Sequence, residues 1–170
     1  TLNQEVITQT VTFCMEQGIP TVVDPKRRNF LTYAGVSLFK PNLKELSEGL
    51  QVELESGNLQ QLAAAVRELK QQMPFEQALI TLSEHGVFIE DGEQEVHIPA
   101  HVRKIADVSG AGDTVVSIAA LALALKLPLQ TIASLANLGG GLVCEHLGVV
   151  PIDLDLLMVE AVTESLFSES

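Results

Sequence analysis

Short apolar runs alternate with segments of helical periodicity along this chain, and that alternation limits the folds open to it. The runs lie at 19–23, 36–39, 78–82, 87–89 and 96–98 and have the length of buried strands. Helical patterns lie at 1–17, from 42 onward, and at 58–73, 115–127, 128 onward and 154–166. This order predicts an α/β fold, with a mostly parallel sheet and helices on both faces, formed by residues 1–170 as one domain.

Two local patterns refine this prediction. The unbroken apolar character of 115–127 predicts a helix that is buried on most sides. Asp91 and Gly92 stand between the last two strand-like runs and fit a type I′ hairpin turn.

The segment 107–114 reads DVSGAGDT and directly precedes the apolar helix. Gly110 and Gly112 allow the backbone to bend so that successive N–H groups point at one spot, and a helix beginning there adds its positive end. The segment is neither a dinucleotide fingerprint, whose third glycine would replace Val115, nor a P-loop. It predicts an anion site of another kind or, alternatively, only a tight turn.

Asp113 places a carboxylate beside this anion site, where its charge opposes anion binding. A general base that takes a proton from a hydroxyl attacking a phosphoryl group would have a reason to stand there. The alternative is an ordinary acid in the first turn of a helix, favoured by the helix dipole.

Polar segments also follow three of the strand-like runs, at 24–28, 40–45 and 83–86. Ligands of open α/β sheets bind at the carboxyl ends of strands, so these segments are candidates for a phosphate site or for solvated turns. Asn42 and Glu45 fit a capping box, and the same spacing would let their oxygens converge on hydrated Mg²⁺. The glycines at 139–141 cost a helix about 1 kcal/mol each, which indicates close approach of a flat ligand or of another helix.

The net charge of −12 and a pI near 4.6 argue against a nucleic-acid surface. A nucleotide site in so acidic a chain needs helix N-termini, a few lysines and Mg²⁺. No apolar run approaches the roughly 20 residues of a membrane span, and no signal peptide opens the chain. Cys14 and Cys144 are predicted to be reduced thiols, so we expect a cytoplasmic protein with no membrane partner.

The segment 107–114 resembles the D-x-x-G-A-G-D-T signature of the ribokinase-like (PfkB-type) sugar kinases. Further matches to that family follow in its order: KPNLKE at 40–45, TLSEHG at 81–86, and the region 137–148. Taken together with VDPK at 23–26, the motifs at 40–45 and 81–86 are most similar to those of the heptose 7-phosphate kinases within that family. The resemblance covers only the C-terminal part of the family's domain, and the chain begins within a helix and without Met. We therefore expect a fragment of a larger kinase, inactive by itself.

The resemblance implies ATP and Mg²⁺ as cofactors and a sugar phosphate as partner. It places the nucleotide near Lys26, Asn42, Leu43, Lys44, Glu45, Ser83, Gly86 and Asn137, with Mg²⁺ at Asn42 and Glu45. The γ-phosphate would rest on the N–H groups of Gly110, Ala111 and Gly112, with Asp113 as base. Potassium would be held by Asp107, Ser109, Val143, His146 and Gly148.

The acceptor implied by the resemblance is the anomeric oxygen of D-glycero-D-manno-heptose 7-phosphate, giving a 1,7-bisphosphate for ADP-heptose and lipopolysaccharide synthesis. The acceptor site would lie mostly outside this chain. Phosphorylation of another sugar or a nucleoside is the alternative within the family, and a nucleotide-binding fragment without turnover is the alternative outside enzymes. Association into a homo-oligomer is compatible with the sequence.

Overall fold

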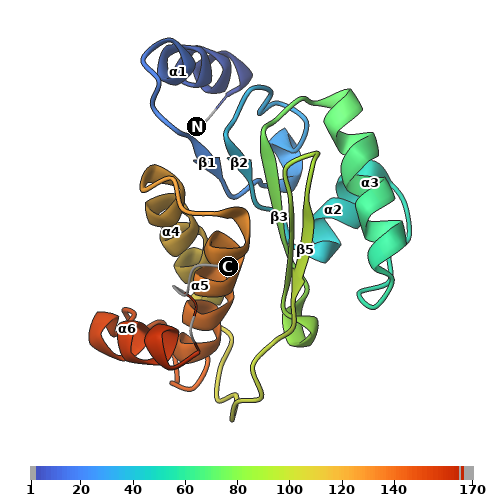
Figure 1. Ribbon diagram of the computed structural model, residues 1–170. Coiled ribbons are helices and arrows are strands. Elements are labelled where there is room, and N and C mark those ends of the chain that lie inside the picture. Colours follow the sequence, from blue (N-terminus) through green and yellow to red (C-terminus); the bar gives the residue numbers. More distant parts are fainter. Residues whose placement is uncertain (1–2, 165, 167–170) are drawn as a thin grey trace.

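The computed structural model describes residues 3–164 and 166, so the ends of the predicted first and last helices lie outside the described part. Its strands form one sheet in the order β1-β2-β3-β4-β5 (Figure 1). They are β1 (Val22–Val23), β2 (Leu38–Phe39), β3 (Gln77–Thr81), β4 (Val87–Glu90) and β5 (Glu95–Ile98). The first three strands are parallel, whereas β4 and β5 are antiparallel to their neighbours. The predicted α/β class is confirmed, with a mixed sheet because a tight turn, rather than a crossover helix, follows β3.

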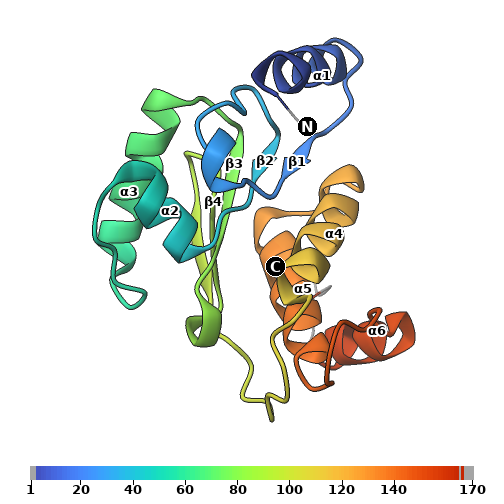
Figure 2. The same ribbon diagram turned by 180° about the vertical axis from the view of Figure 1, so that it is seen from behind.

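The helices cover both faces of this sheet, as predicted (Figures 1 and 2). On one face lie α2 (Leu43–Leu50) and α3 (Leu59–Gln72), and on the other α4 (Ala111–Ala124), α5 (Leu129–Val143) and α6 (Leu154–Thr163). The first helix, α1 (Gln4–Glu16), packs into the same core as α2 and α3. Short 3₁₀ turns, η1 (Arg27–Asn29) and η2 (Ser83–His85), follow β1 and β3. None of the helices in the described part combines the length and apolar character needed to cross a membrane.

Two hydrophobic cores lie on the two faces of the sheet, and the strands supply both by alternation. Leu38 and Leu79 belong to the core under α4 and α5. Phe39 and Ile80, their chain neighbours, belong to the core under α2 and α3. There Phe39 stacks on Phe75, with ring centroids 5.7 Å apart. Because both faces of the sheet are covered, side chains on both sides of each strand are apolar, and the strands appear in the sequence as continuous apolar runs.

The glycines of α5 allow it to approach α4 closely. A Cβ atom at Gly139 would lie 2.1 Å from the Cδ1 atom of Ile118, and one at Gly140 would lie 2.7 Å from a methyl of Val115. Of the two interpretations of this cluster, helix–helix packing is therefore confirmed. The contact fixes the direction of α4, and with it the position of the α4 N-terminus.

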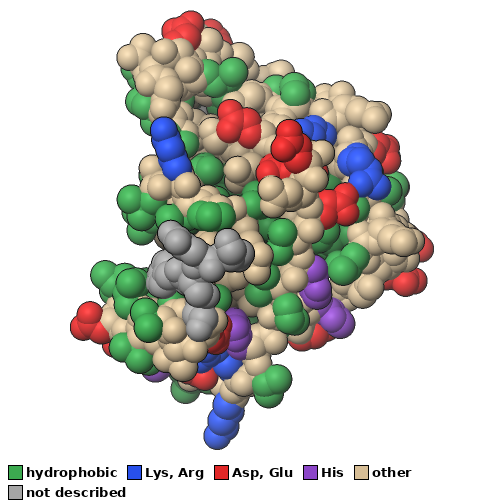
Figure 3. All heavy atoms as spheres, viewed as in Figure 1, with side chains coloured by type: hydrophobic (Ala, Val, Ile, Leu, Met, Phe, Trp, Pro, Cys, Tyr) green, Lys and Arg blue, Asp and Glu red, His purple; other side chains and the backbone are tan. Residues whose placement is uncertain are grey.

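The prediction that the apolar helix is buried on most sides was wrong. Leu121 and Leu125 are 68% and 72% exposed, and further apolar side chains of α6 are also exposed (Figure 3). In the described part of the chain, α4 packs mainly against α5 and β1, and these neighbours cover only one side of it.

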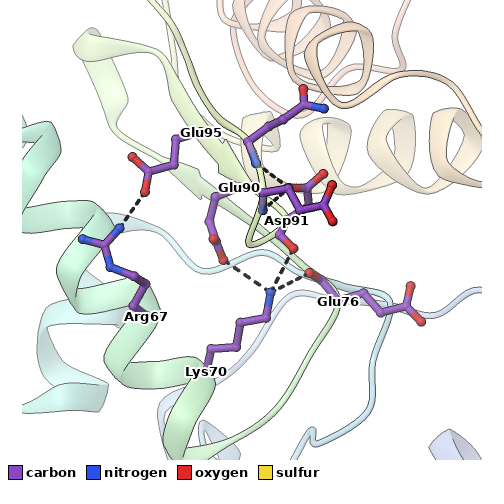
Figure 4. A network of polar contacts seen from close by, with 8 residues as sticks. Arg67, Lys70, Glu76, Glu90, Asp91 and Glu95 are labelled. Atoms are coloured by element: carbon purple, nitrogen blue, oxygen red, sulfur yellow. Dashed lines mark hydrogen bonds and ion pairs between the residues drawn. The ribbon is translucent and has the colours of Figure 1, made fainter.

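The type I′ turn predicted between β4 and β5 was also wrong, because the connection has four residues, 91–94, and Asp91 does not have the positive φ of that turn. The Asp91 carboxylate instead accepts hydrogen bonds from the N–H groups of Glu93 and Gln94, at 2.9 and 2.8 Å. Lys70 of α3 donates to the carbonyl oxygens of Glu76 and Asp91 (Figure 4). Its Nζ atom also lies 3.9 Å from the buried carboxylate of Glu90.

A bulkier residue at Gly139 should separate α4 from α5. We expect Gly139→Val to lower the free energy of unfolding by about 1–3 kcal/mol, because overpacking forces neighbouring groups to move. Chemical denaturation measures the change. Gly57→Val is the matched control, since a Cβ atom there meets nothing within 4 Å. Ile118→Ala should restore part of the loss in the Gly139→Val background, and an unchanged stability of Gly139→Val would contradict the packing account.

Burial raises the pKa of Glu90, so the folded protein binds that proton more tightly than the unfolded chain does. Stability due to this group is therefore highest in acid and falls as pH rises through the raised pKa. We expect Glu90→Gln to raise the free energy of unfolding at pH 7 and to flatten this decline, as measured by denaturation across pH. Glu95→Gln, on the neighbouring strand and paired with Arg67 at 2.7 Å near the surface, should change little. A Glu90→Gln protein less stable than wild type at pH 7 would refute this assignment.

Candidate active site

Three of the predicted polar segments meet at one edge of the sheet, because they follow parallel strands. The backbone N–H of Lys40 donates to the carbonyl of Val23 at 2.8 Å, which joins the ends of β1 and β2. Asn42 forms a bridge with Thr81, which joins the ends of β2 and β3. Lys26, Asn42 and Ser83 thus lie on neighbouring segments.

The N-terminus of α4 points at this same edge. Gly110 has a φ of +80°, and the helix begins at the next residue, so 111–114 form its first turn. A Cβ atom at Gly112 would lie 3.6 Å from the Nζ atom of Lys40. The N–H of Ala111 donates to the carbonyl of Val108 at 3.3 Å, so this amide is not free, contrary to the prediction. Within the described residues the N–H groups of Gly110, Gly112 and Asp113 have no partner and are free to bind an anion.

Asp113 stands in the exposed first turn of α4. Its backbone carbonyl accepts from the Ser117 hydroxyl at 2.7 Å, while its carboxylate has no hydrogen bond or ion pair to any described residue. The carboxylate is therefore open to a ligand. The hydrogen bond to Asp24 is the largest cause of the raised pKa of Lys26, and the negative charge of Asp113 adds a small contribution.

Asp24 links two lysines at this edge. Its carboxylate oxygens accept from Lys26 at 2.7 Å and from Lys40 at 2.8 Å. Burial alone would raise the pKa of Asp24, but the hydrogen bonds from the two lysines outweigh it and hold the pKa below its usual value. Sequence reasoning did not assign Lys40 or Asp24 to the site. The available signal was a lysine directly after the apolar run 36–39, beside an aspartate at the same place after 19–23.

The capping box predicted at the start of α2 is confirmed. Asn42 Oδ1 accepts from the N–H of Glu45, and Glu45 Oε2 accepts from the N–H of Asn42, both at 2.8 Å. The other carboxylate oxygen of Glu45 has no partner among the described residues and can face a hydrated metal ion, and Asn42 Oδ1 keeps a second lone pair. Leu43 packs against the core under α2 and α3. The Nζ atom of Lys44 lies 4.0 Å from a carboxylate oxygen of Glu48, in the next helical turn. The nucleotide contacts predicted for Leu43 and Lys44 stay predictions.

The turn after β3 begins at Ser83 and ends at Gly86. Ser83 is exposed and has a positive φ of 53°. Gly86 is buried, with a φ of +86°, and a Cβ atom there would lie 2.0 Å from the carbonyl oxygen of Ile98. The close approach of β5 therefore requires a glycine at this position. Contact of either residue with a nucleotide stays a prediction.

Asp107 anchors the loop that leads into α4. Its carboxylate accepts from the N–H and hydroxyl of Ser109, at 3.0 and 2.8 Å, and from the N–H of Gly148 at 3.0 Å. These hydrogen bonds, with that from the Ser109 N–H the largest cause, lower the pKa of Asp107. Three of the residues predicted to hold potassium thus lie together. The carbonyl of Val143 accepts from the N–H of His146 at 3.2 Å, which places the remaining two in one turn.

Asn137 lies at the other end of this loop. It is buried on α5, and its amide nitrogen donates to the carbonyl of Pro99 at 2.9 Å. The predicted contact with adenine stays a prediction, and the amide oxygen is the side-chain atom left for it. In the part of the chain that the structure describes, no three His, Cys, Asp or Glu side chains gather to hold a metal ion. Mg²⁺ would therefore depend on Asn42, Glu45, phosphate oxygens and water.

A helix N-terminus and an open carboxylate at the carboxyl edge of an α/β sheet fit the class of phosphoryl-transfer enzymes. The pfkB family carbohydrate kinase model matches residues 1–154, and the chain belongs to this family.

Curated relatives and solved structures agree with this assignment. The chain is 36% identical over 160 residues to the Bifunctional protein HldE of Syntrophotalea carbinolica and 37% identical over 162 residues to that of Mesorhizobium japonicum. These matches cover 92% and 95% of the chain but 32% and 31% of the relatives, so the chain spans about a third of their length.

Two solved structures share the fold. Phosphofructokinase-2 from Escherichia coli in complex with potassium has a TM-score of 0.85 at 22% identity, over 98% of this chain and 54% of that one. Arabidopsis thaliana ribokinase complexed with ribose and ATP has a TM-score of 0.79 at 19% identity, over 99% of this chain and 54% of that one.

Proposed function

We propose that the chain is the nucleotide-binding and catalytic part of an ATP-dependent sugar kinase. The observation that carries this proposal is the open carboxylate of Asp113, in the same helical turn as the free N–H groups of Gly112 and Asp113. An anion cradle and a base, side by side, are what transfer of a phosphoryl group to a hydroxyl requires.

The reaction would proceed by in-line displacement. The acceptor hydroxyl oxygen bonds to the γ-phosphorus, the bond from that phosphorus to the β–γ bridging oxygen breaks, and ADP leaves. Asp113 takes the hydroxyl proton as the new bond forms, and a carboxylate of ordinary basicity suffices because the proton is lost late. The free N–H groups of Gly110, Gly112 and Asp113 stabilise the charge on the transferred group.

The remaining predicted residues would hold the nucleotide and its ions. Mg²⁺, when bound, would offset phosphate charge, and Glu45 and Asn42 could hold it through water. Lys26, Leu43, Lys44, Ser83 and Gly86 would line the phosphates and ribose, and Asn137 would meet the adenine. Potassium would sit near Asp107, a proposal supported by the fold shared with a phosphofructokinase-2 in complex with potassium. It would be coordinated there by Asp107, Ser109 and the carbonyls of Val143, His146 and Gly148.

For the acceptor we propose D-glycero-D-manno-heptose 7-phosphate, phosphorylated at the anomeric oxygen for ADP-heptose synthesis. Its support is the sequence match around 23–26, 40–45 and 81–86, together with relatives at 36–38% identity that are all Bifunctional protein HldE. Assays with other sugars, sugar phosphates and nucleosides distinguish this acceptor from the alternatives.

Loss of the base should slow the chemical step without releasing the nucleotide. We expect Asp113→Asn to lower kcat about 100-fold or more, while the Kd for an ATP analogue with MgCl₂ stays within a few-fold. Turnover is measured by ADP release with the chain embedded in a full-length kinase domain, and nucleotide binding is measured with this chain.

The matched control is Asp155→Asn, which removes an exposed acid from the first turn of α6 and should leave turnover unchanged. Turnover of Asp113→Asn near the wild-type rate would exclude Asp113 as the base. If ATP protects neither form against thermal unfolding, the nucleotide site itself is wrongly placed.

A further inference from the structure

The least exposed cation at the carboxyl edge of the sheet is Lys40. Its side chain is 4% exposed, although it follows β2 directly at the opening of the candidate site. An ammonium has three N–H donors, and among the described residues only Asp24 is found as a partner, at 2.8 Å. Lys40 therefore has donors to spare in a place that water reaches poorly.

The Lys40 ammonium and the N-terminus of α4 place positive charge side by side. The Nζ atom lies 3.6 Å from where a Cβ of Gly112 would be, beside the positive end of the α4 dipole. The free N–H groups of Gly112 and Asp113 are in the same turn. Asp24 pairs with the ammonium on one side, and an anion between the ammonium and the unpaired helix amides would be attracted by both.

A purely structural role explains this arrangement less well. A buried ion pair is weak evidence for stability, because an apolar pair of similar volume often serves equally well. If the pair only joined the ends of β1 and β2, nothing would require the ammonium to lie against Gly112.

We propose that Lys40 is a phosphate-binding residue of the transfer site, which donates to the terminal phosphoryl group of the nucleotide together with the amides of α4. Asp24 is the positioning residue, because it holds Lys40 on one side and Lys26 on the other. Glycine at 112 leaves the space between the ammonium and the helix open. This inference rests on the proposed function, because it takes the anion in the cradle to be the γ-phosphate.

The test compares nucleotides with and without the γ-phosphate. We expect Lys40→Met, made in this chain, to raise the Kd for a non-hydrolysable ATP analogue with MgCl₂ about 10- to 100-fold, the range of a lost charged hydrogen bond. The Kd for ADP with MgCl₂ should stay within about threefold, and calorimetric titration measures both constants. The matched control is Lys70→Met, a half-buried lysine bound to Glu76 and Asp91 away from the site, which should alter neither constant.

The double variant Asp24→Leu with Lys40→Met guards against misfolding of the single one, since it replaces the whole ion pair by apolar groups. It should regain the thermal stability lost by Lys40→Met but still fail to prefer the ATP analogue over ADP. If either variant folds and keeps the wild-type ratio of the two Kd values, Lys40 does not bind the γ-phosphate. If wild-type protein binds neither nucleotide, the proposed function fails first and this assignment falls with it.

Discussion

Parallel pairing of β1, β2 and β3 is the constraint on which the candidate site depends. Each of these strands ends in a polar segment, and parallel pairing brings the three ends to one edge. The backbone hydrogen bond between Lys40 and Val23 and the bridge between Asn42 and Thr81 set the spacing. β1 and β2 are only two residues long, so their order depends on the two cores that cover the sheet.

The second requirement is that α4 points its N-terminus at this edge. The small residues of α5 meet this requirement, because Ile118 and Val115 occupy the space that side chains at 139 and 140 would fill. Arg103 reinforces the arrangement from the loop, with its guanidinium paired to Glu160 and 3.4 Å from Glu145. The glycines of α5 therefore act on the site by packing, although none of them lies in it.

Much of this could be predicted from sequence, where the signal was local. The capping box of Asn42 and Glu45, the stop of α1 at Gly18 and the start of α4 after Gly110 follow from short-range rules about caps and positive φ. The candidate anion site at the start of α4 could be proposed from sequence because its residues are contiguous.

What escaped prediction depends on contacts between distant segments. In the sequence, Lys40 only marks the end of a strand. Its position beside Gly112 follows from the packing of α4 against the sheet and is seen only in the structure. The antiparallel return of β4 and the exposure of Leu121 depend on which neighbours each element has. The hydrogen bond from the Asn137 amide to the carbonyl of Pro99 joins residues 38 positions apart in the sequence. Sequence periodicity contains no information about such pairings.

The carboxylate of Asp107 also determines how the cradle responds to acid. Because its folded pKa lies below the ordinary value, its contribution to stability is complete at neutral pH and is lost only as pH falls through that lowered value. The junction between the α4 loop and Gly148 should thus be insensitive to proton concentration over the range in which a cell works. Any acid inactivation in that range would have to begin elsewhere in the molecule.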